Sequence, residues 1–151
     1  MRAFPALLVA LLLALTAIAA RVSAVQSRPP PPPYYVIVHP QNPLDSVDRT
    51  FVQDAFLKKV RRWPDGEVIH PADLSAKSRT RSRFSNDLLG RSVAAVKAYW
   101  QQRIFSGRDL PPPEFQSDAE AVDYVLKYEG AVAYVSGTTE LRGAKPIGVS
   151  R

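Results

Sequence analysis

Two runs of apolar, β-branched and aromatic residues most constrain what this chain can fold into. Residues 34–38 are Tyr-Tyr-Val-Ile-Val, and residues 131–135 are Ala-Val-Ala-Tyr-Val. Neither run alternates apolar with polar residues, which is typical of strands buried on both faces of a sheet. A sheet covered on both faces needs helices on both sides. The two runs therefore predict an α/β fold.

Helical patterns separate the predicted strands. Helices are predicted over residues 47–57, 81–89, 92–105 and 117–128, and shorter strands over 67–71 and 145–149. Strands that alternate with helices favour parallel pairing. We expect a three-layer α/β/α domain with a short, mostly parallel sheet and helices on both faces.

The first 24 residues have the pattern of a secretory signal peptide. A positive start precedes an apolar run at 6–20, and small residues lead to a cleavage site after Ala24. Cleavage after Ala19 or Ala20, or retention of the segment as a membrane anchor, are the alternatives. Cleavage would leave no transmembrane span and a periplasmic or secreted protein.

Residues 25–33 are predicted to form a stiff proline-rich spacer, and residues 34–151 a single domain. The chain has no cysteine, so disulfides cannot stabilise this domain. The net charge is +6. Because export argues against nucleic acid as a target, anionic small molecules, cell-wall polymers and membrane surfaces remain as expected partners.

No catalytic constellation is recognisable in the sequence. The two histidines, His39 and His70, are each followed by proline and lack the spacing of a metal site. The sequence has neither the Gly-x-Ser-x-Gly elbow of hydrolases nor a glycine-rich phosphate loop. Carboxylate pairs at 45/48 and 118/120 lie at predicted helix starts, where they suit the helix dipole. We expect no enzymatic activity, no metal and no cofactor.

A basic, hydroxyl-rich stretch at residues 74–84 leads into one of the predicted helices. In its centre Ser78 and Thr80 alternate with Arg79 and Arg81. A helix start offers free backbone N–H groups and the positive end of the dipole, which favour an anion. Arginine adds forked hydrogen bonds. The alternative is that Ser78 or Thr80 only caps the helix while the arginines lie in solvent.

Ten segments of the mature chain occur in a familiar order. They are Phe56-Leu57-Lys58-Lys59, Arg62-Trp63-Pro64-Asp65-Gly66, Ser78-Arg79-Thr80-Arg81, Phe84, Leu89-Gly90, Tyr99-Trp100-Gln101, Ile104-Phe105-Ser106-Gly107, Pro111-Pro112-Pro113, Ser117-Asp118 and Gly130 to Ser136. This series resembles the periplasmic phosphate-binding proteins, which are solute-binding components of ABC transporters with the type 2 periplasmic-binding fold. The similarity runs from about Val36 to Ser136.

The resemblance implies an anion site in the basic stretch. Family members carry Gly-Ser-Gly-Thr-Arg at a helix start, where hydroxyl and backbone N–H groups hold phosphate. The corresponding segment of this chain is Lys77-Ser78-Arg79-Thr80-Arg81, in which both glycines of the motif are replaced. We expect Ser78, Arg79, Thr80 and Arg81 to bind phosphate or a related anion. An ABC transporter permease or an envelope protein is the implied partner.

A full family member has a second lobe, whereas residues 34–151 correspond to one lobe. Half of the ligand contacts would then be missing, and an open half-site should bind weakly. One alternative is a degenerate lobe that serves as an interaction module of the cell envelope and binds no solute. Another is electrostatic attachment to anionic lipid or cell-wall polymer through residues 74–84 and the cations at positions 58, 59, 61 and 62.

Overall fold

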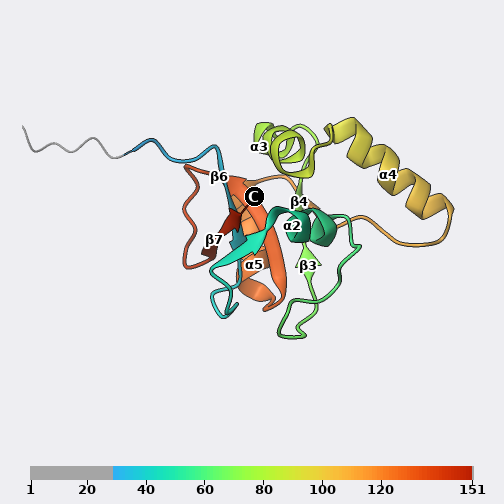
Figure 1. Cartoon of the computed structure of the whole chain (residues 1–151). Helices are drawn as coiled ribbons and strands as arrows, with labels where there is room; N and C mark the ends of the chain where they lie inside the picture. The colour runs from blue at the N-terminus through green and yellow to red at the C-terminus, as the bar shows by residue number, and fades with distance from the viewer. Residues whose placement is uncertain (1–28, 151) are drawn as a thin grey trace, which may run out of the picture. The chain divides into compact units, whose positions relative to one another are not determined.

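A five-stranded sheet in the order β2-β7-β1-β6-β3 forms the centre of the computed structural model, which describes residues 29–150 (Figure 1). Its strands are β1 (Tyr34–Val38), β2 (Ser46–Asp48), β3 (His70–Pro71), β6 (Ala131–Ser136) and β7 (Lys145–Ser150). A separate parallel pair joins β4 (Asp73–Leu74) to β5 (Glu114–Phe115). The predicted signal peptide and the first part of the predicted spacer lie outside the described residues.

The α/β class is confirmed, but the sheet is mixed rather than mostly parallel. β1 runs antiparallel to both β6 and β7, whereas β2 pairs parallel with β7 and β3 pairs parallel with β6. We expected parallel strands because predicted helices alternate with predicted strands along the chain. That order does not determine strand direction, since helices can cover both faces of an antiparallel pair as well.

Helical segments lie between the strands. They are α2 (Arg49–Phe56), α3 (Arg79–Phe84), the π-helix η1 (Ser85–Leu89), α4 (Val93–Phe105) and α5 (Asp118–Lys127). α3 and η1 follow each other without a break, and Gly90 ends this segment with a φ of 64°. The predicted helix at 47–57 begins later than expected because residues 46–48 pair with β7 as β2.

Both faces of the central sheet are covered. All five residues from Ala131 to Val135 are buried, and successive side chains of a strand point to opposite faces. The ring of Tyr134 stacks on Phe84 of α3 with a centroid distance of 3.7 Å and also meets Phe56 of α2. α5 packs against β6 through Ala121, Val122 and Val125, which are all buried.

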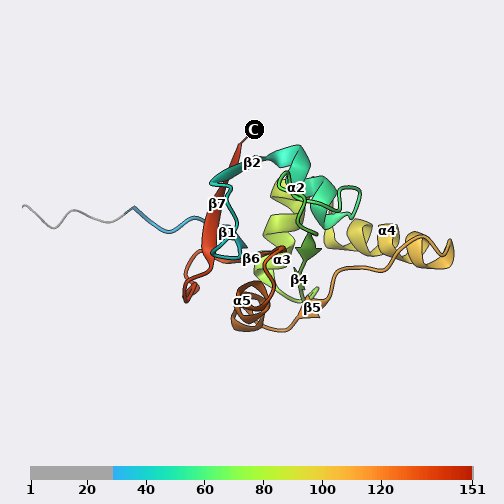
Figure 2. The same cartoon turned by 90° about the horizontal axis from the view of Figure 1, so that it is seen from below.

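α4 differs from the other helices because it reaches away from the sheet in both views (Figures 1 and 2). The sequence predicts an inward face of Val93, Val96, Trp100 and Ile104. Only Val96 and Trp100 of this helix are buried, and Ile104 is 46% exposed. Within residues 29–150, no helix has the length and apolar character that a membrane span requires.

Candidate anion site

Ser78 is the N-cap of α3. Its Oγ accepts a hydrogen bond from the backbone N–H of Arg81 at 3.2 Å, and its own N–H donates to the carbonyl of Ser75 at 2.8 Å. The capping role that the sequence left open is therefore present in the structure. A hydroxyl has one donor hydrogen besides its acceptor sites, so a capping serine can still donate to an anion.

The first turn of α3 leaves two backbone donors for a ligand. The N–H of Arg81 is taken by Ser78 Oγ, and the N–H of Ser82 donates to the Ser78 carbonyl at 3.1 Å. The N–H groups of Arg79 and Thr80 precede these and have no intrahelical acceptor by helix geometry. Thr80 is half-buried and Arg79 is exposed. These two positions therefore carry the donors at the open end of the helix.

Arg81 points into the protein instead of toward solvent. Its side chain is only 4% exposed, and its guanidinium lies 2.9 Å from Asp73 Oδ2 and 3.1 Å from Glu114 Oε1. It also donates to the carbonyl of Leu74. The Nε of Arg81 is buried and has no partner among the described residues. Arg81 thus joins the start of α3 to β4 and β5.

Tyr134 completes this group, which we call the buried ion cluster (Asp73, Arg81 and Tyr134); Glu114, with its side chain 49% exposed, lies at the edge of the cluster. The Tyr134 hydroxyl donates to Asp73 Oδ1, which also accepts the N–H of Leu74 at 2.9 Å. Burial raises the pKa of Asp73 to about 6, although Arg81 and the two hydrogen bonds act in the opposite direction. Burial, and then the charge of Asp73, also raises the pKa of Tyr134.

The sequence prediction did not include Asp73, Glu114 or Tyr134. A signal for Asp73 is present, because this carboxylate stands between Ala72 and Leu74 at the end of an apolar segment. A carboxylate that is buried needs a cation or hydrogen-bond donors. Glu114 and Tyr134 carry no comparable local signal.

Lys77 and Arg79, which stand in place of the two family glycines, adopt ordinary backbone geometry. Within residues 29–150, Lys58 and Arg142 are the non-glycine residues with positive φ, so Lys77 and Arg79 both have negative φ. Arg79 is the first residue of α3. The loop therefore does not need glycine for its conformation, although the side chains at 77 and 79 limit how closely an anion can approach the backbone.

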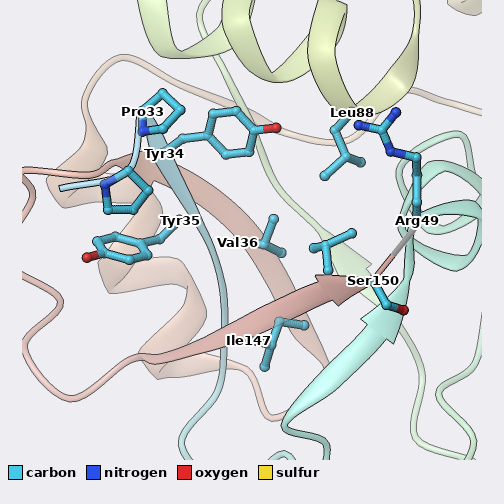
Figure 3. A pocket seen from close by; sticks show the side chains of 10 residues that line it. Pro33, Tyr34, Tyr35, Val36, Arg49, Leu88, Ile147 and Ser150 are labelled. Atoms are coloured by element: carbon cyan, nitrogen blue, oxygen red, sulfur yellow. The ribbon is translucent and has the colours of Figure 1, made fainter. Parts of the chain in front are cut away.

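The predicted site residues differ in exposure: Arg79 is exposed, Ser78 and Thr80 are half-buried, and Arg81 is buried. A cavity of about 390 Å³ lies elsewhere, against β1 and β7 (Figure 3). Its lining residues include Tyr34, Arg49 and Ser150 but none of the residues from Ser78 to Arg81. The Arg49 side chain there donates to the carbonyl of Asp87 at 2.6 Å. The structure thus brings Ser78, Arg79 and Thr80 together at one helix start and turns Arg81 inward.

No family model and no curated protein sequence matches the chain. Solved structures do match it in fold. A protein described as a phosphate ABC transporter substrate-binding protein, with bound phosphate, from Clostridium perfringens superimposes with a TM-score of 0.62 at 16% identity, over 77% of this chain and 44% of that one. The chain has the fold of a periplasmic-binding-protein lobe.

Two further structures share the fold of this lobe. An ABC-type phosphate transport receptor from Vibrio cholerae gives a TM-score of 0.60 at 18% identity, over 77% of this chain and 45% of that one. PstS from Borrelia burgdorferi gives a TM-score of 0.58 at 9% identity, over 78% of this chain and 47% of that one. The lobe spans less than half the length of each of these three structures.

Proposed function

We propose that the lobe binds inorganic phosphate or a related oxyanion at the start of α3, as an exported solute-binding component. One observation carries this proposal. The cap formed by Ser78, beside two backbone N–H groups without intrahelical acceptors, occurs on a fold shared with a substrate-binding protein that holds phosphate.

Each residue of the stretch has a distinct role in this proposal. Ser78 and Thr80 donate through their hydroxyls, and the N–H groups of Arg79 and Thr80 point along the helix dipole. The exposed side chains of Lys77 and Arg79 add charge and forked hydrogen bonds. Arg81 is a positioning residue, because its guanidinium holds the first turn of α3 against β4 and β5.

We propose that the protein acts outside the cytoplasm. It would be exported by a signal peptide at residues 1–24, followed by a spacer at 25–33 and the lobe at 34–151. Its proposed partner is an ABC transporter permease or an envelope protein. Because the site is open to solvent on the lobe by itself, we expect affinity in the millimolar range.

Calorimetry of the full chain with phosphate tests the proposal. Ser78→Ala/Thr80→Ala should abolish the binding heat, because it removes both hydroxyl donors. Ser92→Ala is the matched control: Ser92 Oγ caps α4 by accepting the N–H of Ala95 at 3.1 Å, so a cap is lost away from the site. No heat at millimolar phosphate, or unchanged affinity in the double variant, would favour the interaction module that binds no solute.

The replaced glycines offer a second test in the opposite direction. Lys77→Gly/Arg79→Gly should strengthen phosphate binding if close backbone approach limits affinity, and weaken it if the two cations supply most of the attraction. Arg83→Gly, an exposed cation later in α3, controls for charge and helix propensity together. Equal affinity in all three proteins would place the ligand away from this helix start.

A further inference from the structure

The far end of α4 has an unusual surface for a helix of this lobe. We call residues 103–110 the α4 tip. α4 has thirteen residues, of which Val96 and Trp100 are buried. The end of α4 reaches away from the sheet, and the chain then turns back toward β5 (Figures 1 and 2). Most residues of the tip are exposed, whereas Arg103 and Asp109 are half-buried.

Apolar side chains gather at the tip. Phe105 is 89% exposed, Leu110 is 65% exposed and Ile104 is 46% exposed. These are three of the five large apolar residues that are exposed within residues 29–150. A single exposed apolar residue needs no explanation, whereas several within one short segment indicate an interaction surface.

Four cations belong to the tip or contact it. Arg103 and Arg108 belong to the tip itself, and Lys58 and Arg61 reach it from the segment after α2. Lys58 Nζ donates to the Leu110 carbonyl at 2.9 Å and lies 3.9 Å from Asp109, while Arg61 lies 2.5 Å from the same carboxylate. Lys58 and Arg61 thus share the carboxylate of Asp109, whereas the exposed Arg108 has no ion-pair partner among residues 29–150.

We propose that the α4 tip inserts shallowly into the surface of an anionic lipid membrane. Phe105, Leu110 and Ile104 would enter the boundary between headgroups and acyl chains, while the exposed Arg61 and Arg108 contact lipid phosphates. The charge is complementary to such a surface. A projecting apolar segment also suits a deformable lipid interface better than a small-molecule ligand, which needs a concave site.

This surface is separate from the proposed anion site. The tip lies at the end of α4, and the anion site lies at the start of α3. It also differs from attachment by charge alone, because insertion requires the apolar side chains. Binding should therefore depend on both Leu110 and Arg108, and not on salt alone.

The absence of cysteine from the sequence allows a direct test in the full chain. Phe105→Cys is labelled with an environment-sensitive, apolar fluorophore and mixed with vesicles of phosphatidylcholine, alone or with phosphatidylglycerol. We expect a blue shift, and quenching by a lipid-borne quencher, only with phosphatidylglycerol. The matched control is the same label at Val68→Cys, an exposed apolar position away from the tip. Because the label reports its own surroundings, attachment through another segment does not mimic insertion of the tip.

Second substitutions separate the apolar and charged contributions. In the chain labelled at residue 105, Leu110→Ser should weaken vesicle binding about tenfold because one apolar side chain is lost. Arg108→Gln should weaken it about fivefold, and Lys97→Gln, an exposed cation earlier on α4, should change it less. Three outcomes would overturn the proposal: no shift with anionic vesicles, equal shifts at residues 105 and 68, or a concentration-dependent shift without vesicles, which would show that a second copy covers the tip.

Discussion

The buried ion cluster and the α4 tip both invert the usual distribution of residues, but in opposite ways. The cluster places Asp73 and Arg81 in the interior, and each has partners there. The tip leaves Phe105 and Leu110 in solvent. Buried charge that is paired is satisfied inside the fold, so it needs no external partner. Exposed apolar surface has no internal compensation, which is why only the tip points to a partner.

Substitution of one phenylalanine in each region should give the largest difference in the free energy of unfolding. Phe84 is 1% exposed and stacks on Tyr134, whereas Phe105 is 89% exposed. We expect Phe84→Ala to lower the free energy of unfolding by about 3–5 kcal/mol, and Phe105→Ala to change it by less than about 0.5 kcal/mol. Urea denaturation measures both. Similar losses in the two variants would mean that the tip packs against the lobe in solution.

Two arginines should show the next largest contrast. Arg81→Leu leaves the buried carboxylate of Asp73 without its cation, and we expect a loss of about 3 kcal/mol. This loss is at the low end of the range for breaking a buried ion pair, because Asp73, with its raised pKa, can take up a proton and become neutral. The exposed Arg108 should tolerate Arg108→Leu within about 0.5 kcal/mol.

A double variant checks the cause of the Arg81 effect. Arg81→Leu/Asp73→Leu removes both charges, so stability should recover in part relative to Arg81→Leu. Without any recovery, the loss would come from packing of the arginine side chain and not from an unpaired carboxylate.

The raised pKa of Asp73 predicts a pH dependence of stability. The pKa is about 6 in the folded protein and 3.8 in its reference state, so between these values the folded state binds more protons than the unfolded state. The stability contributed by protonated Asp73 is complete below pH 3.8 and is lost as pH rises through 6. From pH 4 to 7, wild type should lose about 1–3 kcal/mol relative to Asp73→Asn.

Urea denaturation of wild type and Asp73→Asn across this pH range measures the difference in their free energies of unfolding. The contributions of the other carboxylates are the same in both proteins and cancel. A relative gain for wild type as pH rises would show that Arg81 and Tyr134 keep Asp73 ionised at low pH.

The caps of α3 and α4 should give the smallest contrast. Ser78 and Ser92 both accept an N–H of the first turn, and losing either cap costs about 1 kcal/mol. Ser78→Ala should lower global stability, because α3 packs on the core through Phe84. Ser92→Ala should instead speed amide hydrogen exchange in α4 about fivefold, since this helix can open locally. Equal effects on global unfolding would show that α4 unfolds only with the whole lobe.

Much of the fold could be predicted from local patterns in the sequence. The apolar runs at 34–38 and 131–135 became β1 and the buried part of β6. The capping box of Ser117 and Glu120 is present at the start of α5. Ser78 is the cap of α3. Burial periodicity and capping are properties of a few neighbouring residues, so a sequence can carry them by itself.

Pairings between distant residues were decided by the tertiary structure. The sequence did not predict that β1 runs antiparallel to β6, nor that residues 46–48, 73–74 and 114–115 form strands. The sequence indicated that Arg81 is either exposed to solvent or binds a ligand. In the structure it pairs with Asp73 and Glu114, and Tyr134 hydrogen-bonds to Asp73. Nor did the apolar spacing in α4 show that Ile104 would be 46% exposed. The physical reason is the same in each case: local patterns determine which residues tend to be buried or to cap a helix, whereas only the folded chain determines which distant groups meet them.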